Sequence, residues 1–598
     1  MPDYFSVSKA DMQKIWLSVL GGLVLLFPIL SFQGAYRPSP PVAPPVFQEY
    51  PKNYFVSPVN DQLRLTGTFG ELRPDHFHAG IDIKSKTGRA GQPVVAAADG
   101  FVERISVQAG GYGNALYIRH PNGYMTVYGH LDRFSPELQQ YVRQQQYRRE
   151  SFEVNLHPPN NQFKVKKGQE VAKLGNSGGS SGAHLHFEIR NTTTGKVLNP
   201  QLFGLPIADQ VPPDIRDMKV YFLNEQREVQ SSQAFPIERR PNGTLGVAGD
   251  TVRLAAWRVG FGVKVYDHMT GLNNDNGIYS LQMYANDQLA FQWKMDELDF
   301  DESRYLNAHI DYPVRHKYGA WFHRCFILPG DYLGNYDRTE SLGAVALSRD
   351  FPVKITVYTA DPAGNQASVQ FWALRADPIP PFISAPYQYA LPFDQENRIA
   401  LDGFAMTLPQ GTLYETLPFV YKTTPDESQG VHSSMYHLHN NHTPAHRYFE
   451  IALRPLALPP ELNSKVCIAH CGDGRPVNCG GAWRGDMLVT KVRSFGDYCV
   501  MSDTVPPQIT PVVFAADMRR KNTLSFRIRD NFGTGGSADG MSYRGTVDGR
   551  WVLFQYDRKI ARLTYVFDEH VGPGQHTVVM KVKDDLGNEG VWQGVFRR

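Results

Sequence analysis

Hydrophobic and polar residues alternate in three short stretches of the first third of the chain, at 77–83 (FHAGIDI), 124–131 (YMTVYGHL) and 182–190 (GAHLHFEIR). A period of two is typical of a β-strand with one polar and one apolar face. We therefore expect three strands whose polar faces line one open groove. The ionisable candidates on those faces are His78, Asp82, His130, His184 and His186.

A different pattern occupies the N-terminus, where residues 15–32 (IWLSVLGGLVLLFPILSF) are almost wholly apolar and follow Lys9 and Lys14. Such a segment is typical of an export signal or a single membrane anchor. We expect residues 1–35 to be a signal peptide or an N-terminal membrane anchor. Either one places the remaining chain outside the cytoplasm. A Pro-rich linker, 36–52, follows and should be extended.

The motif Asp-x-x-Pro-Pro-x-Ile occurs at 209–215, 377–383 and 503–509. Paired prolines suit the entry to an edge strand or a stiff joint between domains. They predict a first domain over 53–206 and three β-rich modules over 207–375, 376–503 and 504–598.

The chain is rich in turn formers, with 53 Gly and 42 Pro, so the predicted fold class is mainly β, with antiparallel sheets and β-sandwich accessory modules.

Two of these modules end alike, with an alternating run followed by Asp-x-x-Gly-Asn at 361–365 and at 584–588. This ending resembles that of bacterial immunoglobulin-like modules, which implies immunoglobulin-like sandwiches for 207–375 and 504–598. The turn aspartates are expected to cap Asx turns, and calcium binding is the less favoured alternative. They are Asp267, Asp361, Asp530 and Asp584.

Charge and cysteine content limit the partners and the compartment. Lys plus Arg number 61 and Asp plus Glu 59, so a net charge of +2 predicts no nucleic-acid partner.

Four cysteines lie close together in the module 376–503, whereas Cys325 stands alone. In an exported protein we expect one or two local disulfides there, with structural zinc as the alternative. The four are Cys467, Cys471, Cys479 and Cys499.

The groove residues suit hydrolysis at a single zinc ion. A catalytic zinc takes three nitrogen or oxygen ligands and keeps one position open for water. Two histidines and one aspartate provide that set, and further histidines beside it move protons near neutral pH. The pattern alone does not say which of the four histidines bind the metal.

The order His-x-x-x-Asp, Tyr-Gly-His-Leu and Gly-x-His-Leu-His-Phe-Glu-Ile-Arg resembles the lysostaphin/LytM-like zinc endopeptidases, family 23 of the metallopeptidases. The resemblance implies a compact antiparallel β domain with a groove. It assigns the Zn²⁺ ligands to His78, Asp82 and His186, and the activation of water and stabilisation of the oxyanion to His130 and His184. His76 is excluded because only His78 has an aspartate four residues on.

The implied function is zinc-dependent hydrolysis of peptide bonds of peptidoglycan in the cell envelope, in which water at the metal attacks the carbonyl with the help of His130 and His184. The accessory modules would hold the enzyme on the wall or on envelope protein partners. The alternative is a catalytically silent peptidoglycan-binding scaffold or a regulator of another wall hydrolase. A third hypothesis is an adhesin-like protein whose main work lies in the β modules.

The predicted first domain departs from the family pattern by an insertion at 132–164. Residues 136–150 (PELQQYVRQQQYRRE) are polar and predict a short helix. A solvated surface excursion is the favoured interpretation, and a wall beside the groove is the alternative.

Overall fold

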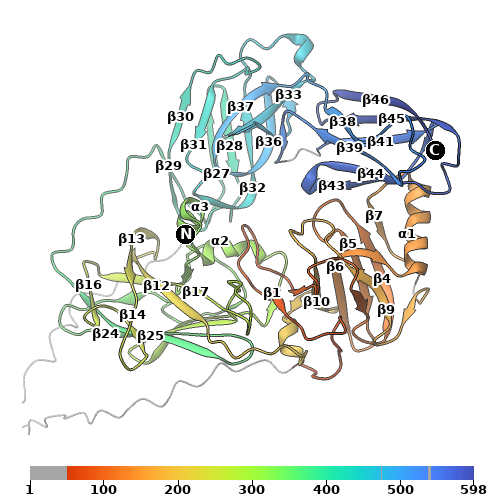
Figure 1. Cartoon of the computed structure of the whole chain (residues 1–598). Coiled ribbons are helices and arrows are strands. Elements are labelled where there is room, and N and C mark those ends of the chain that lie inside the picture. The colour runs from red at the N-terminus through yellow and green to blue at the C-terminus, as the bar shows by residue number, and fades with distance from the viewer. Residues whose placement is uncertain (1–49, 160, 473, 537–539) are drawn as a thin grey trace, which may run out of the picture. The chain divides into compact units, whose positions relative to one another are not determined.

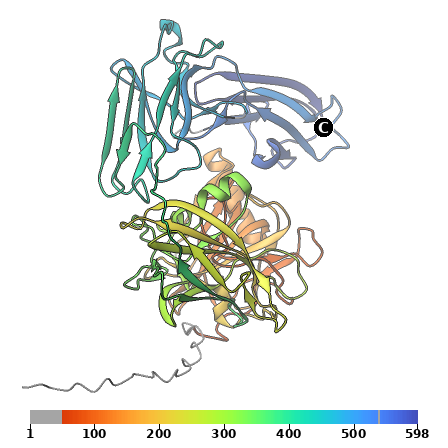
Figure 2. The same ribbon diagram turned by 90° about the vertical axis from the view of Figure 1, so that its left-hand side faces the viewer.

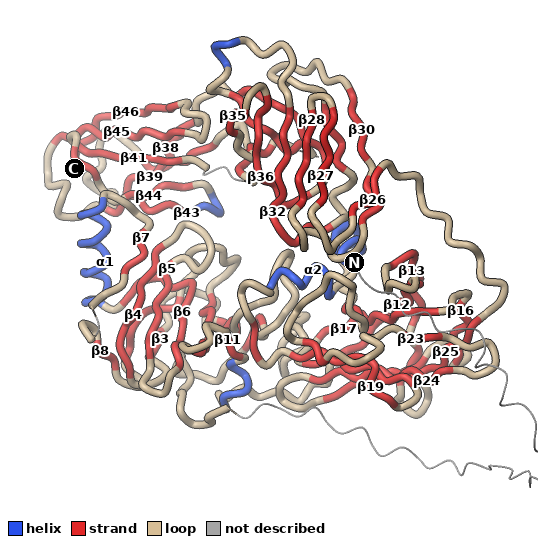
Figure 3. Tube along the Cα trace, turned by 180° about the vertical axis from the view of Figure 1, so that it is seen from behind, coloured by secondary structure: helices blue, strands red, loops and turns tan. Residues whose placement is uncertain are grey.

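The computed structural model describes residues 50–598 except 160, 473 and 537–539 (Figure 1). The predicted signal or anchor, 1–35, and almost all of the linker therefore lie outside the described residues. Within the described part, no helix combines the length and the apolar character needed to cross a bilayer. Strands dominate (Figure 3), and nearly all strand pairs are antiparallel, so the predicted fold class is confirmed.

The first β domain is built on one sheet whose main path runs β1-β2-β10-β6-β5-β4-β7. Strand β10 lies between β2 and β6 and pairs antiparallel with both. The path strands are β1 Leu65–Gly67, β2 Ile81–Lys84, β4 Gly100–Val107, β5 Asn114–Arg119, β6 Tyr124–Phe134, β7 Val154–Leu156 and β10 His184–Asn191. The accessory strands are β3 Pro93–Val95, β8 Lys164–Val165, β9 Glu170–Leu174 and β11 Val197–Leu198, followed by the short helix η1 Pro200–Phe203.

The apolar face of β10 forms the centre of this domain's core. Leu185, Phe187 and Ile189 alternate with the polar positions and are all fully buried. Burying a side chain of this size stabilises the fold by about 1.5–3 kcal/mol. Because β10 is paired on both sides and packed on one face, its polar residues are held on a rigid element.

The first predicted strand is shorter than expected. Strand β2 begins only at Ile81, and His78 lies in a preceding turn, where its backbone N–H donates to the carbonyl oxygen of Glu71 at 2.9 Å. Gly80 explains the break: a Cβ there would lie 2.6 Å from the carbonyl oxygen of Phe187 and 2.8 Å from the ring of His186. The turn therefore passes too close to β10 for any side chain at position 80.

The module over 207–375 contains two sheets, with the paths β13-β12-β17-β21 and β14-β15-β25-β24-β18-β19-β22. Strand β20 pairs with β11 of the first domain, and Phe77 lies 6.2 Å from Trp293 between ring centroids. Pairing and packing thus cross the predicted boundary at 206. The strands of the first sheet are β12 Asp214–Leu223, β13 Val229–Pro236, β17 Arg258–Tyr266, β21 His323–Arg324 and β23 Val345–Ala346.

The second sheet and the helices of this module have the following bounds. The strands are β14 Glu238–Arg239, β15 Leu245–Gly246, β16 Thr251–Leu254, β18 Ser280–Ala285, β19 Gln288–Lys294, β22 Tyr336–Asp337, β24 Val353–Ala360 and β25 Gln366–Arg375, with β20 Glu297–Leu298 outside it. The helices are η2 Ser303–Tyr305, α2 Leu306–His309 and α3 Tyr312–Tyr318. The alternating run that precedes the Asp-x-x-Gly-Asn sequence at 361–365 begins at Val353, and residues 353–358 of it lie in β24.

The module over 376–503 has two larger sheets, β27-β28-β32-β36-β35 and β30-β31-β37-β33-β34-β40, and the pair β26-β29. Strand β40 comes from the next module. The strands are β26 Tyr389–Leu391, β27 Asn397–Leu401, β28 Phe404–Leu408, β29 Leu417–Phe419, β30 Tyr421–Thr424, β31 Met435–Leu438, β32 Pro444–Leu453, β33 Val466–Cys471, β34 Val477–Asn478, β35 Ala482–Arg484, β36 Met487–Ser494, β37 Gly496–Ser502 and β40 Gly533–Thr534, with the short helix η3 Pro460–Leu462.

The last module is a sandwich of two four-stranded sheets, β38-β39-β44-β43 and β42-β41-β45-β46. Figure 2 shows its long blue strands side by side. The strands are β38 Gln508–Val513, β39 Thr523–Arg529, β41 Ser542–Val547, β42 Arg550–Trp551, β43 Phe554–Asp557, β44 Arg562–Val566, β45 Gln575–Lys583 and β46 Glu589–Arg597, with the short helix η4 Arg558–Ile560.

The expected disulfides are wrong for this structure, because the described residues form none. Cys325 and Cys479 belong to separate hydrophobic cores, whereas Cys467 and Cys499 lie in a third cluster against which Cys471 packs. The Sγ atoms of Cys471 and Cys499 are 3.2 Å apart, which exceeds the length of a disulfide bond.

The helix predicted in the insertion is present as α1, Pro136–Arg149. It is not the solvated excursion that we favoured. The ring of Tyr147 stacks on that of His570 at 4.0 Å, and Nη2 of Arg143 lies 2.9 Å from Oδ2 of Asp568. The helix therefore packs against the last module.

Candidate metal centre

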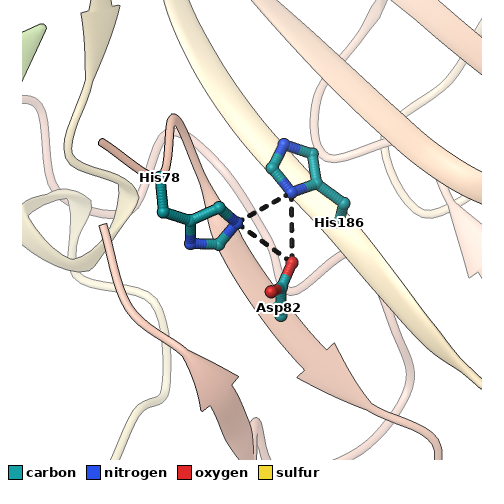
Figure 4. A group of neighbouring side chains, drawn as sticks. All are labelled: His78, Asp82 and His186. Atoms are coloured by element: carbon teal, nitrogen blue, oxygen red, sulfur yellow. Dashed lines mark hydrogen bonds and ion pairs between the residues drawn. The ribbon is translucent and has the colours of Figure 1, made fainter. Parts of the chain in front are cut away.

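Three of the predicted residues meet at one point (Figure 4). Strand pairing places His186 of β10 directly opposite Asp82 of β2, and the turn before β2 brings His78 beside them. Nε2 of His78, Oδ1 of Asp82 and Nδ1 of His186 lie 3.1 Å from one another in each pair. All three residues are buried.

The free nitrogen of His78 faces this centre. Its Nδ1 lies 2.8 Å from the carbonyl oxygen of Thr68, and a carbonyl oxygen only accepts hydrogen bonds. Nδ1 therefore carries the hydrogen, and the lone pair of Nε2 is directed towards Asp82 and His186. A backbone carbonyl that fixes the tautomer of a histidine is a common partner of metal ligands.

A carboxylate fixes the orientation of the ring of His186. Oε1 of Glu188 lies 2.8 Å from Nε2 of His186, so Nδ1 is left to face Asp82. Glu188 is itself held by Nε of Arg190 at 2.6 Å and by the hydroxyl of Tyr112 at 2.5 Å. Burial alone would raise the pKa of Glu188, but Arg190 and the bonds from His186 and Tyr112 lower it to about 2. The carboxylate therefore stays ionised although it is fully buried.

Asp82 is the other negative charge of the centre. Its Oδ2 accepts a hydrogen bond from Nη2 of Arg73 at 2.9 Å, which leaves Oδ1 for the histidines. Burial opposes ionisation, but His78, His184 and His186 together lower the pKa of Asp82 well below its usual range. The centre thus holds one carboxylate oxygen and two imidazole nitrogens.

The remaining predicted residues, His130 and His184, stand beside the three. Their rings lie 4.7 Å apart, and Nε2 of His184 is 3.4 Å from Oδ1 of Asp82. Nδ1 of His130 donates to the carbonyl oxygen of Ser177 at 2.9 Å, and Nδ1 of His184 to that of Gly182 at 2.9 Å. Burial, and then the neighbouring His186 and His184, lower the pKa of His130 to about 3. Both side chains therefore keep Nε2 available on the side of the centre.

The donor set fits a zinc ion. Zinc bonds to nitrogen and oxygen of about 2.0–2.2 Å place tetrahedral ligands about 3.3–3.6 Å apart. The three donor atoms, at 3.1 Å, need to separate by only a few tenths of an ångström. Two neutral nitrogens and one carboxylate leave a fourth position of a tetrahedron for water or substrate.

His76 lies apart from this centre. Its side chain is 56% exposed, and its Nδ1 pairs with Asp75 at 2.7 Å. His76 belongs to the bend at 74–76 and is exposed, whereas His78 follows the bridge between Phe77 and Leu72 and is buried.

Several supporting residues have no role in the sequence analysis. Glu188 and Arg190 follow His186 at every second position of the alternating stretch 182–190, so their shared face is the sequence signal for them. Arg73 and Tyr112 match the family pattern of the metallopeptidases, but they lie in loops, so no strand alternation assigned them to the metal centre. The carbonyl oxygen of Thr68 is a backbone group, which no side-chain pattern reveals.

Comparison with known proteins finds two family models that match parts of this chain, one of them over residues of the metal centre. The model of peptidase family M23 matches residues 76–147, and that of a Zu5-like domain matches residues 388–503. An uncharacterised metalloprotease of Haemophilus influenzae is 35% identical over 150 residues, which cover 25% of each chain. The DD-carboxypeptidase/endopeptidase Mpg of Neisseria meningitidis is 34% identical over 156 residues, 25% of this chain and 29% of the relative.

The murein hydrolase activator NlpD of Salmonella dublin is 38% identical over 121 residues, 20% of this chain and 24% of the relative. The chain therefore matches about a quarter of the length of these curated relatives. The matched family model begins at residue 76, so it includes His78 and Asp82. With the β-rich fold and the metal-type cluster, these matches show that the chain carries a peptidase family M23 domain.

Proposed function

We propose that this protein is a zinc-dependent endopeptidase that hydrolyses peptide bonds of peptidoglycan in the cell envelope. The convergence of His78, Asp82 and His186, each fixed by a further hydrogen bond, supports the proposal most strongly. These outer partners direct one donor atom of each residue to a shared point, which is the arrangement of metal ligands.

His78, Asp82 and His186 would hold the zinc ion through Nε2, Oδ1 and Nδ1. When bound, zinc lowers the pKa of a water molecule to about 7 and polarises a carbonyl oxygen. Glu188 and Thr68 orient the two imidazoles from behind, so the ligand atoms are positioned before the ion arrives.

His130 and His184 would act on the substrate side. Each donates through Nδ1–H to a backbone carbonyl, which leaves Nε2 as the reactive nitrogen. One of them would accept the proton of the attacking water at its free Nε2. The other, when it carries a second proton on Nε2, would donate a hydrogen bond to the oxygen that becomes negative as the peptide carbonyl is attacked. Their 4.7 Å ring separation suits two roles at one carbonyl group.

The names of the relatives support the proposed substrate class and compartment. One is named as a DD-carboxypeptidase/endopeptidase and another as a murein hydrolase activator. We infer a site of action outside the cytoplasm, with the β modules binding the wall or envelope proteins and residues 15–32 serving as signal or anchor.

The test is mass spectrometry of muropeptides after purified sacculi are incubated with the zinc-loaded full chain. New peptide ends in the wild-type digest, lost in His184→Ala at unchanged zinc content, are the expected result. If zinc-loaded protein released no fragment, the endopeptidase function would be excluded and a role without catalysis would be favoured.

That alternative is a silent scaffold or a regulator of another wall hydrolase, and the similarity to a murein hydrolase activator motivates it. It predicts that the chain stimulates a separate hydrolase equally well as wild type and as His184→Ala. The presence of both His130 and His184 beside the cluster favours the enzyme, since a scaffold has no use for them.

A further inference from the structure

Two groups of three aspartates occur in the β modules, away from the metal centre. In the first group, carboxylate oxygens of Asp209, Asp267 and Asp361 lie within 4.8 Å of one another. These residues come from the repeated Asp-x-x-Pro-Pro motif, from the end of β17 and from the Asp-x-x-Gly-Asn turn. The fold thus brings together three acidic residues that are distant in the sequence.

The carboxylate of Asp361 does cap its turn, but through the residue four positions on and not through the second residue as in the predicted Asx turn. The backbone N–H of Asn365 donates to Oδ1 of Asp361 at 2.9 Å, and its side-chain amide donates to Oδ2 at 2.7 Å. The same amide lies 3.4 Å from the carbonyl oxygen of Asp209. Asn365 therefore fixes Asp361 and links it to Asp209, and it leaves Asp267 without a cap.

Asp267 is the observation that requires a ligand. It is fully buried, and among the described residues neither carboxylate oxygen accepts a hydrogen bond of standard geometry. Burial, followed by the carboxylates of Asp361 and Asp209, raises its pKa to about 8, and only the N–H of His268 acts in the opposite direction. An ionised carboxylate buried beside two others is unstable unless a cation compensates it.

A fourth oxygen lies on the same side. Asp267 and Asn276 form an antiparallel bridge in which each backbone N–H donates to the other's carbonyl, at 2.9 and 2.8 Å. Residues paired in this way direct their side chains to the same face. Asn276 is 1% exposed, and neither polar atom of its amide has a partner among the described residues.

We propose that Asp209, Asp267, Asp361 and Asn276 bind a calcium ion. The donor set consists only of carboxylate and amide oxygens, which hard cations prefer over the nitrogen and sulfur ligands of zinc. Calcium accepts many protein oxygens in flexible geometry, whereas magnesium keeps several of its waters. A site whose central carboxylate is fully buried has little room for those waters and selects calcium.

The last module repeats the arrangement. Carboxylate oxygens of Asp503, Asp530 and Asp584 also lie within 4.8 Å of one another. Asn588 donates to both carboxylate oxygens of Asp584, at 2.8 and 2.7 Å, and to the carbonyl oxygen of Asp503 at 3.0 Å. Asp530 is only half-buried as a residue, although its Oδ1 is buried without a hydrogen-bond partner among the described residues, so this group is a less buried copy of the first.

The remaining copy of the Asp-x-x-Pro-Pro motif, at 377–383, provides a control. Asp377 lies 3.4 Å from Nε of Arg375 and belongs to no acidic group among the described residues. The motif alone does not make the cluster; the paired strand end and the Asp-x-x-Gly-Asn turn are also needed. Calcium bound at the first site would tie the segment that enters the module, through Asp209, to the ends of two of its strands.

The experiment compares the chelator-treated full chain with its Asp267→Asn and Asp377→Asn variants. Equilibrium dialysis against radioactive calcium should show one bound ion fewer for Asp267→Asn and no loss for Asp377→Asn. Calcium should also slow the hydrogen exchange of amides at 209–211 and 361–365 in wild type, and not in Asp267→Asn. The amide at 267 removes a buried charge, so this variant should fold at least as stably as wild type without calcium.

Equal calcium binding by wild type and Asp267→Asn would overturn the proposal, as would exchange at 361–365 that calcium does not change. Equal protection by magnesium at the same concentration would overturn the choice of calcium. None of these readouts depends on peptidase activity, so they stand whether or not the chain cleaves peptidoglycan.

Discussion

Oε1 of Glu188 lies 2.8 Å from Nε2 of His186, two residues away on the same face of β10, and it thereby sets which ring nitrogen of His186 faces Asp82. The carboxylate is fully buried and is held by Arg190 and Tyr112. It acts on the metal centre through His186 and is a positioning residue.

Replacing Glu188 by Gln should lower zinc affinity and activity by about 10–100-fold, the usual effect of losing such a partner. The amide keeps the shape but removes the charge that holds the His186 hydrogen. Zinc titration against a competing chelator measures the change. Glu103→Gln, which breaks only the partly exposed ion pair with Arg119, is the matched control and should bind zinc as wild type does. Equal affinity for all three proteins would exclude the positioning role.

His76 and His78 form a natural pair for testing the ligand assignment. Only His78 contacts Asp82 and His186, whereas His76 is exposed and pairs with Asp75. We expect His78→Ala to lose stoichiometric zinc and His76→Ala to keep it. Metal analysis of the purified variants checks this, and retention of zinc by His78→Ala would refute the assignment.

Tyr147 should hold the last module against helix α1. Its ring stacks on His570 at 4.0 Å, and its hydroxyl donates to Asp568. An aromatic pair contributes about 0.5–1.5 kcal/mol beyond the area that it buries. In Tyr147→Ala, amides at 562–571 should therefore exchange faster by up to about tenfold.

Hydrogen exchange followed by mass spectrometry makes this comparison. Gln144→Ala changes an exposed position of the same helix and should leave the exchange as it is in wild type. If Tyr147→Ala exchanges no faster than this control, the contact does not hold the module.

The buried pair of His309 and His323 should make the chain sensitive to acid. Nε2 of His309 lies 2.8 Å from Nδ1 of His323, and both side chains are buried beside Trp293. Burial lowers the pKa of both histidines, and His323 and Arg324 lower that of His309 further. The folded state therefore excludes protons that the unfolded histidines bind below a pKa of about 6.5.

Because the unfolded state binds more protons in that range, the free energy of unfolding should fall as the pH drops below about 6.5, by up to about 1.4 kcal/mol per pH unit for each histidine. Thermal melting between pH 7.5 and 5 should show a shallower slope for His323→Gln than for wild type. The exposed His76→Gln serves as control. Identical slopes for all three chains would contradict this prediction.

Much of the fold and of the site could be read from local pattern. The alternation at 182–190 and at 353–358 is present as β10 and β24, and the polar stretch 136–150 forms α1. These features depend on side chains within one element, where the period of hydrophobic residues directly reflects which face is buried. The prediction of disulfides from nearness in sequence was wrong: Cys467, Cys471 and Cys499 do meet in one cluster, but no disulfide joins them among the described residues.

The sequence by itself determined the candidates: the five histidine and aspartate residues of the groove, and the aspartates of the repeated motifs. Only the tertiary structure decided their partners, because strand register is set by contacts between distant segments. The pairing of β10 with β2 places His186 opposite Asp82, and a slip of one residue would turn His186 to the other face of the sheet. In the same way, only packing buries Asp267 beside Asp209 and Asp361, where a carboxylate without a cation is costly.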